Sequence, residues 1–362
     1  MNTIVILGAG QIGSAAYKIL QSRISNADYY DVFLGAELHL WNQIPARGVT
    51  GVYDFSTSST LGIQKRLQSI GATHVINALP FMLNEKIALA SAGAGCHYID
   101  FTEDDIMADK VKQIYSVLPS LTVAVKCGLA PGFINYVGHA LAKKIDKPET
   151  LLISVGALPR HVNFSSDPAA NYNLSWSVDG LVNEYIRPCR VRINGQAISV
   201  RPLTGSEHII VDGINYEAAF TSGGVGSLVQ ELKHVPNVYY KTLRYPGHYD
   251  YVRGAITRHA GNFDRLRAEF INTFSINTND VIVVYASCTG HMLDGTLRRE
   301  VFAEHYVGAD GLSGIQSVTA GAGIAILELM LSNKISGTIN HADVSLESFI
   351  NTESYKSTYF RR

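Results

Sequence analysis

The beginning of the chain constrains the fold more than any other segment. Residues 3–7 (TIVIL) form a short, continuously apolar run, which is typical of a parallel strand buried on both faces. The sequence GAGQIG follows at residues 8–13, and residues 14–21 are rich in helix formers. A strand, a GxGxxG turn and a helix in this order form the phosphate-binding unit of a dinucleotide fold. We therefore predict that a dinucleotide cofactor contacts Gly8, Gly10, Gln11, Ile12 and Gly13.

The three glycines of this turn have different tasks in such a fold. Gly8 permits the tight turn, Gly10 lets the backbone approach a pyrophosphate, and Gly13 lets the helix pack closely on the strand. The helix N-terminus then offers N–H groups and a partial positive charge to the phosphates.

Strands and helices continue to alternate after this unit, at intervals of about 25–30 residues. The expected strands are residues 36–42, 51–54, 73–80, 96–100 and 121–125, and the expected helices between them are residues 58–70 and 84–92. This alternation predicts an α/β fold with a Rossmann-type doubly wound parallel sheet.

Ligands of doubly wound sheets bind beyond the carboxyl ends of the strands. Asp100 ends a buried strand at this edge and is a candidate catalytic residue, and Thr102 is a candidate substrate contact. Further cofactor contacts are expected in the loops that follow the strands, at Asn42, Asp54, Ala78, Leu79, Pro80, Cys127 and Gly128.

The end of the second strand bears on the choice of cofactor. Dinucleotide folds that use NAD usually place an acid there, which accepts a hydrogen bond from the adenosine ribose. The sequence places Asn42 at this position of the predicted strand. Asparagine can bind a 2′-hydroxyl but does not repel a 2′-phosphate, so NAD and NADP both stay open.

The pattern changes after about residue 150 to strands separated by polar turns. Strands are expected at residues 151–156 and 281–286, and Asn194-Gly195 predicts a hairpin within residues 190–200. We expect a second α+β domain of mainly antiparallel sheet. The apolar helix expected at residues 319–331 is assigned back to the first domain. The predicted division is residues 1–130 plus about 315–362 for the Rossmann domain, and 131–314 for a substrate-binding and dimerisation domain.

Composition narrows the class of protein. The 362 residues are 46% hydrophobic and carry a net charge of −1, which argues against disorder and against a general nucleic-acid binder. Four separated cysteines and 12 histidines show no metal-ligand spacing, so no metal site is expected. The N-terminus does not read as a secretion signal, and no apolar run approaches the ~18 residues of a membrane helix. We expect a cytoplasmic protein without a membrane partner.

Several segments resemble the saccharopine dehydrogenase-like superfamily, and within it the lysine 6-dehydrogenases. The similarity extends from residue 1 to about 250 and is weaker afterwards. Its most specific parts are WSVDG at residues 176–180, TSGG at 221–224 and KTLRYPGH at 241–248. The other matching stretches are residues 8–13, CGLAPG at 127–132, Glu184-Tyr185 and Pro202-Leu203-Thr204.

The resemblance implies an NAD(P)-dependent oxidoreductase that acts on the amine-bearing carbon of an amino acid, and a homodimer. In a lysine 6-dehydrogenase the carbon bearing the ε-amino group gives a hydride to the nicotinamide and the imine is hydrolysed. Ammonia leaves, and the resulting semialdehyde cyclises to a piperideine carboxylate.

This chemistry needs a base to deprotonate the amine and a cation to bind the substrate carboxylate. Arg244 is the candidate for the carboxylate, and Lys241 and His248 are candidate bases. Each has a structural alternative: a domain-interface ion pair, an exposed lysine, or a satisfied histidine beside a turn. Asp179 is a candidate substrate contact, and a turn or helix cap explains it equally well. The remaining candidate substrate contacts are Pro131, Gly132, Ser222 and Gly223.

Two other functions stay open from the sequence. A saccharopine or carboxynorspermidine dehydrogenase would use the same hydride chemistry on a secondary amine, so the substrate is an amino acid or a polyamine-type molecule. A nucleotide-binding sensor or scaffold would keep the fold without turnover.

Overall fold

The computed structural model describes residues 2–24, 30–37, 49–53, 55–161 and 171–361. The chain divides into two compact units. Unit 1 comprises Met1–Gly132 and Thr319–Thr358, and unit 2 comprises Phe133–Val318 and Tyr359–Arg362.

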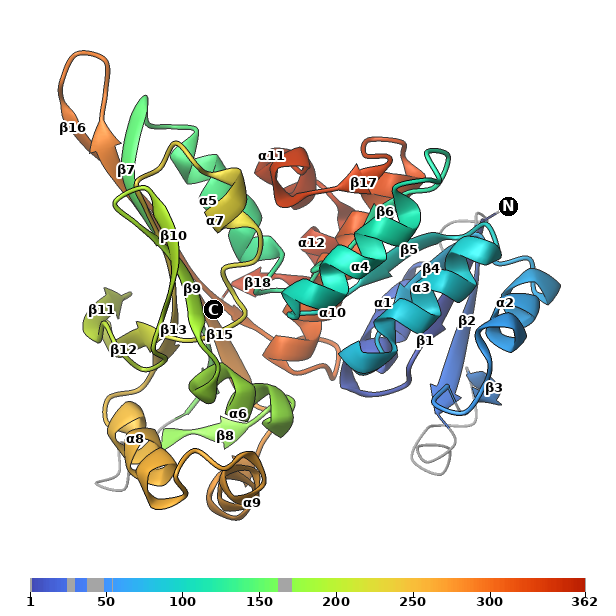
Figure 1. The fold of residues 1–362 in the computed structure, drawn as a ribbon, viewed down its shortest axis with the longest axis horizontal. Helices are drawn as coiled ribbons and strands as arrows, with labels where there is room; N and C mark the ends of the chain where they lie inside the picture. The colour runs from blue at the N-terminus through green and yellow to red at the C-terminus, as the bar shows by residue number, and fades with distance from the viewer. Residues whose placement is uncertain (1, 25–29, 38–48, 54, 162–170, 362) are drawn as a thin grey trace. The chain divides into compact units, whose positions relative to one another are not determined.

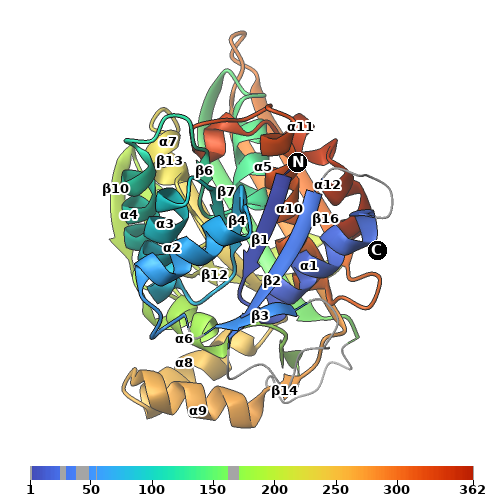
Figure 2. The ribbon, with the colours of Figure 1, turned by 90° about the vertical axis from the view of Figure 1, so that its right-hand side faces the viewer.

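Unit 1 is built on a seven-stranded sheet in the order β17-β6-β5-β4-β1-β2-β3, and every pairing in it is parallel (Figure 1). Figure 2 shows β1, β2 and β3 side by side in this sheet. The sheet extends to both sides of β1, through β4 on one side and β2 on the other, so the predicted doubly wound sheet is confirmed. The strands are β1 (Asn2–Leu7), β2 (Tyr30–Glu37), β3 (Val49–Tyr53), β4 (His74–Asn77), β5 (His97–Asp100), β6 (Val123–Ala124) and β17 (Thr338–Ile339).

Helices connect these strands and bury their apolar sides against the sheet. Ile63, Ile87 and Val111, from three successive helices, belong to one core with Val5 and Val75 of the sheet. Serine and aspartate caps begin two of these helices, because Ser59 and Asp104 accept backbone N–H groups of the first turn. The helices are α1 (Gln11–Ile24), α2 (Thr60–Ser69), α3 (Asn84–Gly93), α4 (Asp105–Tyr115), α11 (Leu346–Ile350) and α12 (Glu353–Thr358).

The second strand lies earlier in the chain than predicted. β2 begins at Tyr30 and pairs with β1 from Asn2↔Tyr30 to Leu7↔Gly35, so it shares only residues 36 and 37 with the expected strand at 36–42. A central parallel strand is covered on both faces and reads as an apolar run, as Val32-Phe33-Leu34 does. Residues 38–42 of the expected strand lie outside the described residues. Asn42 and Asp54 lie outside the described residues.

Unit 2 contains a nine-stranded sheet whose main path is β10-β9-β13-β7-β15-β16-β18. Only β13 and β7 pair in parallel within this sheet, so the prediction of a mainly antiparallel domain is confirmed. The strands are β7 (Lys147–Pro159), β9 (Cys189–Ile193), β10 (Gln196–Val200), β11 (Glu207–Val211), β12 (Ile214–Phe220), β13 (Asn237–Arg244), β15 (Asp280–His291), β16 (Leu297–Val307) and β18 (Phe360–Arg361), with β8 (Asn173–Leu174) and β14 (Ser275–Ile276) in a separate pair.

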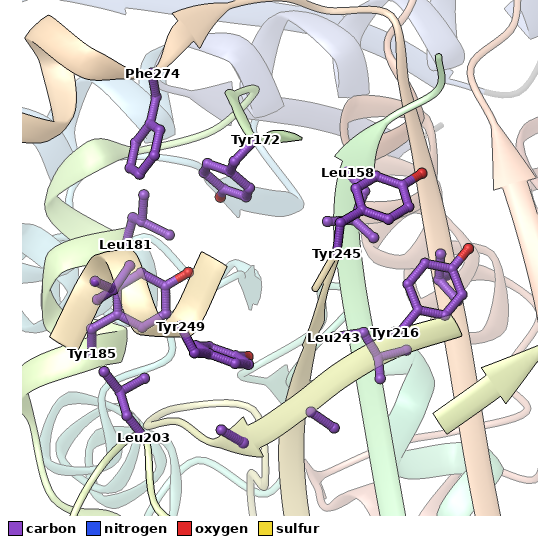
Figure 3. Packing of buried hydrophobic residues seen from close by; sticks show 14 of the residues in the cluster. Leu158, Tyr172, Leu181, Tyr185, Leu203, Tyr216, Leu243, Tyr245, Tyr249 and Phe274 are labelled. Carbon is purple, nitrogen blue, oxygen red and sulfur yellow. The ribbon is translucent and has the colours of Figure 1, made fainter. Parts of the chain in front are cut away.

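The predicted hairpin forms between β9 and β10. Asn194 and Gly195 have φ angles of 48° and 79°, as a two-residue turn with both residues left-handed requires. One face of the sheet carries a large core rich in tyrosine, with Tyr172, Tyr185 and Tyr249 among its members (Figure 3). The helices of this unit are α5 (Phe133–Ala142), α6 (Val178–Ile186), α7 (Leu228–Glu231), α8 (His248–Arg258) and α9 (Phe263–Thr273).

Helix α10 (Gly314–Leu331) corrects the expectation that no apolar segment approaches the length of a membrane helix. In the described part of the chain it is the one helix long and apolar enough to cross a membrane, and 72% of it is buried inside the structure. Its small residues explain this burial, because added Cβ atoms would approach Thr358 to 2.1 Å at Gly321 and Phe101 to 2.5 Å at Gly323. We interpret α10 as a core helix.

Candidate functional site

The glycine turn after β1 is held tightly against two neighbouring strands. The Gly8 N–H donates to the Gly35 carbonyl at 3.0 Å, and Gly8 has a left-handed φ of 102°. An added Cβ would lie 2.8 Å from the Ala78 carbonyl oxygen at Gly8, and 1.8 Å from the Gly8 carbonyl oxygen at Gly13. Both positions therefore need glycine for reasons of packing.

Gly10 differs from its two neighbours because an added Cβ would meet no protein atom within 4 Å. It therefore borders open space directly before α1, whose first turn contains no acidic residue. The first N–H groups of a helix lack partners within the helix and attract anions. The residues here fit the pyrophosphate of a dinucleotide: Gly10 gives access, and Gln11, Ile12 and Gly13 begin the helix.

A cavity of about 540 Å³ lies between α2 and the strands β1 and β2. It reaches Leu7 and Gly35, which are the residues next to the glycine turn. Ligand sites are commonly apolar cavities of ~300–1,000 Å³ with a few polar groups. The sequence did not predict this cavity. Its lining is Val5, Leu7, Gly35, Phe55, Ser58, Ser59, Gly62, Ile63, Arg66, Leu67 and Ile70.

The loop after β4 contacts the same turn. The Ala78 N–H donates to the Leu7 carbonyl at 2.8 Å, and the Leu79 N–H donates to the Asn77 side chain at 3.2 Å. Pro80 ends this loop before the short helical turn Phe81–Leu83. The fold thus brings Ala78 beside Gly8, as expected for strand ends at one edge of a parallel sheet.

Asp100 is buried and its carboxylate is fully engaged. One oxygen accepts the backbone N–H groups of Thr102 and Lys126, at 3.1 and 3.0 Å. The other accepts from Asn84 at 3.1 Å and from the Tyr98 hydroxyl at 3.2 Å. Burial raises the pKa of the Asp100 carboxyl to about 6, while the two backbone N–H groups act in the opposite direction.

These contacts favour a positioning role for Asp100 over the predicted catalytic one. Asp100 joins the loops after β5 and β6, and the Thr102 hydroxyl in turn accepts the Asp104 N–H at 3.2 Å. Asn77 extends the network by donating to Asn84 and Tyr98, both at 2.9 Å. Asn77 and Asn84 were not predicted, although Asn77 directly precedes a predicted site loop.

The loop after β6 is a compact turn of small residues. The Cys127 N–H donates to the Asp100 carbonyl at 2.9 Å, and burial raises the pKa of the Cys127 thiol well above its ordinary value. The Gly128 N–H donates to the Pro131 carbonyl at 3.0 Å, next to the cis peptide bond before Pro131. Gly132 is left-handed, and its Cβ would lie 2.0 Å from the Gly128 carbonyl oxygen. Residue 132 must therefore be glycine, and the turn at residues 127–132 contributes backbone groups rather than polar side chains.

Unit 2 places Arg244 in a buried cluster at the end of β13. Its Nη2 donates to Glu184 at 3.0 Å, its Nε to the Tyr185 hydroxyl at 2.7 Å, and its Nη1 to the Leu243 carbonyl at 3.0 Å. The guanidinium also lies over the Tyr172 ring at 5.0 Å, and Arg244 is 2% exposed. Three of the five N–H groups of the guanidinium donate to protein acceptors, which favours a structural role over the predicted binding of a substrate carboxylate. Arg244 is the counter-ion of Glu184.

His248 joins the same cluster from the first turn of α8. Its Nε2 lies 2.9 Å from the Tyr185 hydroxyl, and its ring packs against Tyr172 and Phe274. Burial, together with the positive charge of Arg244, lowers the pKa of His248 well below its ordinary value. Its Nδ1 has no hydrogen-bond partner among the described residues. The histidine is neutral and buried, which favours a structural role over the predicted base.

Lys241 is not brought together with Arg244. The two residues are three apart on one strand, so their side chains leave opposite faces of the sheet. The Lys241 ammonium donates to the Gly205 carbonyl at 2.6 Å, pairs with Glu207, and lies 4.9 Å from the centre of the Phe220 ring.

The WSVDG and TSGG segments have clear structural roles. Ser177 caps α6, and Asp179 lies in its first turn, where it forms a half-exposed ion pair with Arg267 at 2.6 Å. The Ser222 N–H donates to the Glu184 carbonyl at 3.0 Å, and its hydroxyl to the Asn183 carbonyl at 3.1 Å. The following Gly223 is left-handed, with a φ of 101°. The contacts of Asp179 and Ser222 do not favour the substrate roles predicted for them.

No metal centre can be assigned within the part of the chain that the structure describes, because no three His, Cys, Asp or Glu side chains are grouped to hold an ion. The residues brought together in unit 1 are those that follow β1, β4, β5 and β6. They lie at the edge of the parallel sheet where such folds bind nucleotides. In unit 2, Arg244, Glu184 and His248 form a buried cluster.

Comparison with known proteins places this architecture. The structure resembles saccharopine dehydrogenase (L-Glu forming) from Saccharomyces cerevisiae with a TM-score of 0.78 and 14% identity, covering 100% of this chain and 99% of that one. It also resembles the homospermidine synthase of Legionella pneumophila, solved in complex with NAD, with a TM-score of 0.64 and 14% identity over 99% of this chain and 90% of that one. Residues 128–308, half of the chain, match the model of the saccharopine dehydrogenase C-terminal domain. The chain therefore belongs to the saccharopine dehydrogenase-like family of oxidoreductases.

Proposed function

We propose that the protein is an NAD-dependent dehydrogenase that oxidises the amine-bearing carbon of an amino acid, most closely a lysine 6-dehydrogenase. The observation that carries the proposal is the open space beside Gly10 at the N-terminus of α1, between two glycines that packing requires. Family membership and the NAD in the homospermidine synthase structure support the same cofactor class.

The end of β2 supports NAD over NADP. Gly35 of β2 lies opposite Leu7, the last residue of β1 before the glycine turn. β2 continues for two more residues and ends at Glu37. An acid at the end of the second strand accepts a ribose hydroxyl and repels a 2′-phosphate. Glu37 therefore replaces Asn42 as the proposed ribose residue, and the cavity beside Gly35 offers an apolar site for the adenine ring.

A bound nicotinamide would supply the hydride acceptor, and the residues of this chain would position it against the substrate carbon. The glycine turn would hold the pyrophosphate, and the network of Asp100 fixes the loops after β5 and β6 at the same sheet edge. Positioning of this kind accounts for several orders of magnitude in rate. Loss of a hydride from the neutral amine would leave an iminium ion, which water hydrolyses to the semialdehyde and ammonium.

The test is formation of reduced nicotinamide from L-lysine, with NAD and NADP in separate reactions and no oxo acid added. Saccharopine and carboxynorspermidine serve as parallel substrates, and the Gly10→Ala variant serves as the control for nucleotide binding. Turnover of lysine with NAD is the expected result. Turnover of only a secondary amine would move the substrate to the alternative class, and tight NAD binding without any turnover would support a sensor or scaffold.

A further inference from the structure

Lys126 has an unusual backbone conformation and is unusually buried for a lysine. It follows β6 by two residues and has a φ angle of 63°, in the left-handed region that residues other than glycine rarely adopt. Residues held in such conformations cluster at functional sites, where the surrounding contacts maintain them. Lys126 is also only 6% exposed, and lysine is almost never buried without a partner.

The backbone of Lys126 connects the ends of three parallel strands. Its N–H donates to the Asp100 carboxylate at 3.0 Å, at the end of β5. Its carbonyl oxygen lies 3.3 Å from Nε2 of His341, a buried residue in the short helical turn that follows β17. Because β5, β6 and β17 are neighbours in the sheet, Lys126 lies where their carboxyl ends meet.

The side chain of Lys126 reaches a further element. Its ammonium forms an ion pair with Asp105, the first residue of α4, and the lysine side chain is 7% exposed. Asp100 and Asp105 flank the loop at residues 101–104, which contains the predicted substrate contact Thr102. Lys126 therefore holds both ends of this loop, one through its backbone and the other through its side chain.

This loop lies on the side of the sheet where a nicotinamide would be placed. A dinucleotide binds across the point where the strand order reverses, with one half on each side of it. The proposed ribose residue Glu37 ends β2, on one side of β1, so the other half of the cofactor would extend towards β4, β5 and β6. The loops after β5 and β6 are therefore the ones expected nearest to hydride transfer.

We propose that Lys126 is a positioning residue for hydride transfer, whose ion pair with Asp105 sets the loop at residues 101–104 against the turn at residues 127–132. The proposal rests on the proposed function. A displacement of about 1 Å at a reacting centre can lower the rate by about a hundredfold. Loss of the pair should therefore lower kcat, while the glycine turn and β2, which would bind the rest of the cofactor, stay unchanged.

Removal of either charge tests the proposal with L-lysine and NAD. Lys126→Met and Asp105→Asn should each lower kcat by about tenfold or more, while the dissociation constant of NAD stays within about twofold of the wild type. Lys126→Arg keeps the charge and should retain most of the wild-type kcat. Asp109→Asn, which removes an exposed acid from the same helix, is the matched control and should leave kcat unchanged.

The double variant Lys126→Met/Asp105→Asn separates positioning from stability. Asp105→Asn alone leaves a buried ammonium without a counter-charge, so it should lower the melting temperature. The double variant removes both charges and should regain thermal stability without regaining kcat. A kcat that recovers together with stability would reduce the pair to a structural role and overturn the proposal. An unchanged kcat in Lys126→Met would do the same.

Hydrogen exchange tests the same role without turnover. Backbone amides at residues 101–104 and 127–132 should exchange faster in Lys126→Met than in the wild type, and those of β1 should exchange equally. Equal exchange at the two loops would overturn the role of Lys126. A wild type that turns over none of the substrates would instead overturn the proposed function.

Discussion

Gly10 and Gly13 belong to one motif but differ in what surrounds them. Gly10→Ala adds a Cβ in open space, so the melting temperature should not change, while NAD should bind about tenfold more weakly or worse. Gly13→Ala forces a Cβ to 1.8 Å from a backbone carbonyl, so it should lower the free energy of unfolding by about 1–3 kcal/mol or more. Thermal unfolding and NAD titration check both. Unchanged NAD affinity in Gly10→Ala would show that the pyrophosphate does not approach this residue.

Arg244 makes a prediction about stability because it is the buried partner of Glu184. Arg244→Ala leaves a carboxylate uncompensated in the core and should lower the free energy of unfolding by about 3–5 kcal/mol. The additional change Glu184→Gln removes that charge and should restore part of the loss. Chemical denaturation of the single and double variants measures both effects. A stable Arg244→Ala variant with weaker substrate binding would return Arg244 to its predicted role.

The sequence predicts which polar residues lie at strand ends, but it does not predict which partners their side chains contact. Arg244 was recognised as a cation, yet its partner Glu184 is 60 residues away, and its acceptors come from α6 and from β13. Asp100 was placed correctly at the end of β5, but two of the four donors to its carboxylate, Asn84 and the Lys126 N–H, come from other elements and depend on the tertiary fold. Whether such a side chain faces a ligand or the protein is decided by packing, which no spacing records.

At the scale of elements, the end of β2 determines the expected cofactor. Glu37→Ala should reduce the preference for NAD by removing the repulsion of a 2′-phosphate, and the ratio of kcat/KM with NAD to that with NADP should fall by about tenfold or more. Asn42→Ala is the matched control and should leave the ratio unchanged. The measurement is steady-state kinetics with each nucleotide. A changed ratio in the Asn42 variant alone would restore Asn42 as the ribose residue.

Elements with strong local signals were predicted well. β1, the glycine turn and the Asn194-Gly195 hairpin follow from short patterns that dictate backbone conformation. β2 begins earlier than predicted, because a short apolar run such as Val32-Phe33-Leu34 does not by itself distinguish a buried strand from a buried helix. β17 was not predicted, because two residues that pair at a sheet edge leave almost no local signal.

At the scale of the whole molecule, each unit has its own core, and both cores contain buried titratable groups. In unit 1, His74 and His97 stack at 4.6 Å between centroids. Burial, together with the neighbouring His97, lowers the pKa of His74 to about 4, and burial lowers the pKa of His97 in the same direction. Both rings are therefore neutral in the folded protein near pH 7.

The pKa of His74 makes stability depend on pH with a defined sign. The unfolded chain binds this proton near the ordinary pKa of 6.5, whereas the folded protein binds it only near 4. Between these values the unfolded state holds more protons, so stability falls as the pH falls from about 6.5 to 4, by about 3 kcal/mol from this residue. The unfolding free energy of His74→Asn, measured by denaturant titration across this range, should decrease less than that of the wild type by that amount. His208→Asn changes an exposed histidine and should keep the wild-type slope. Equal slopes in the wild type and His74→Asn would mean that His74 titrates alike in the folded and unfolded states.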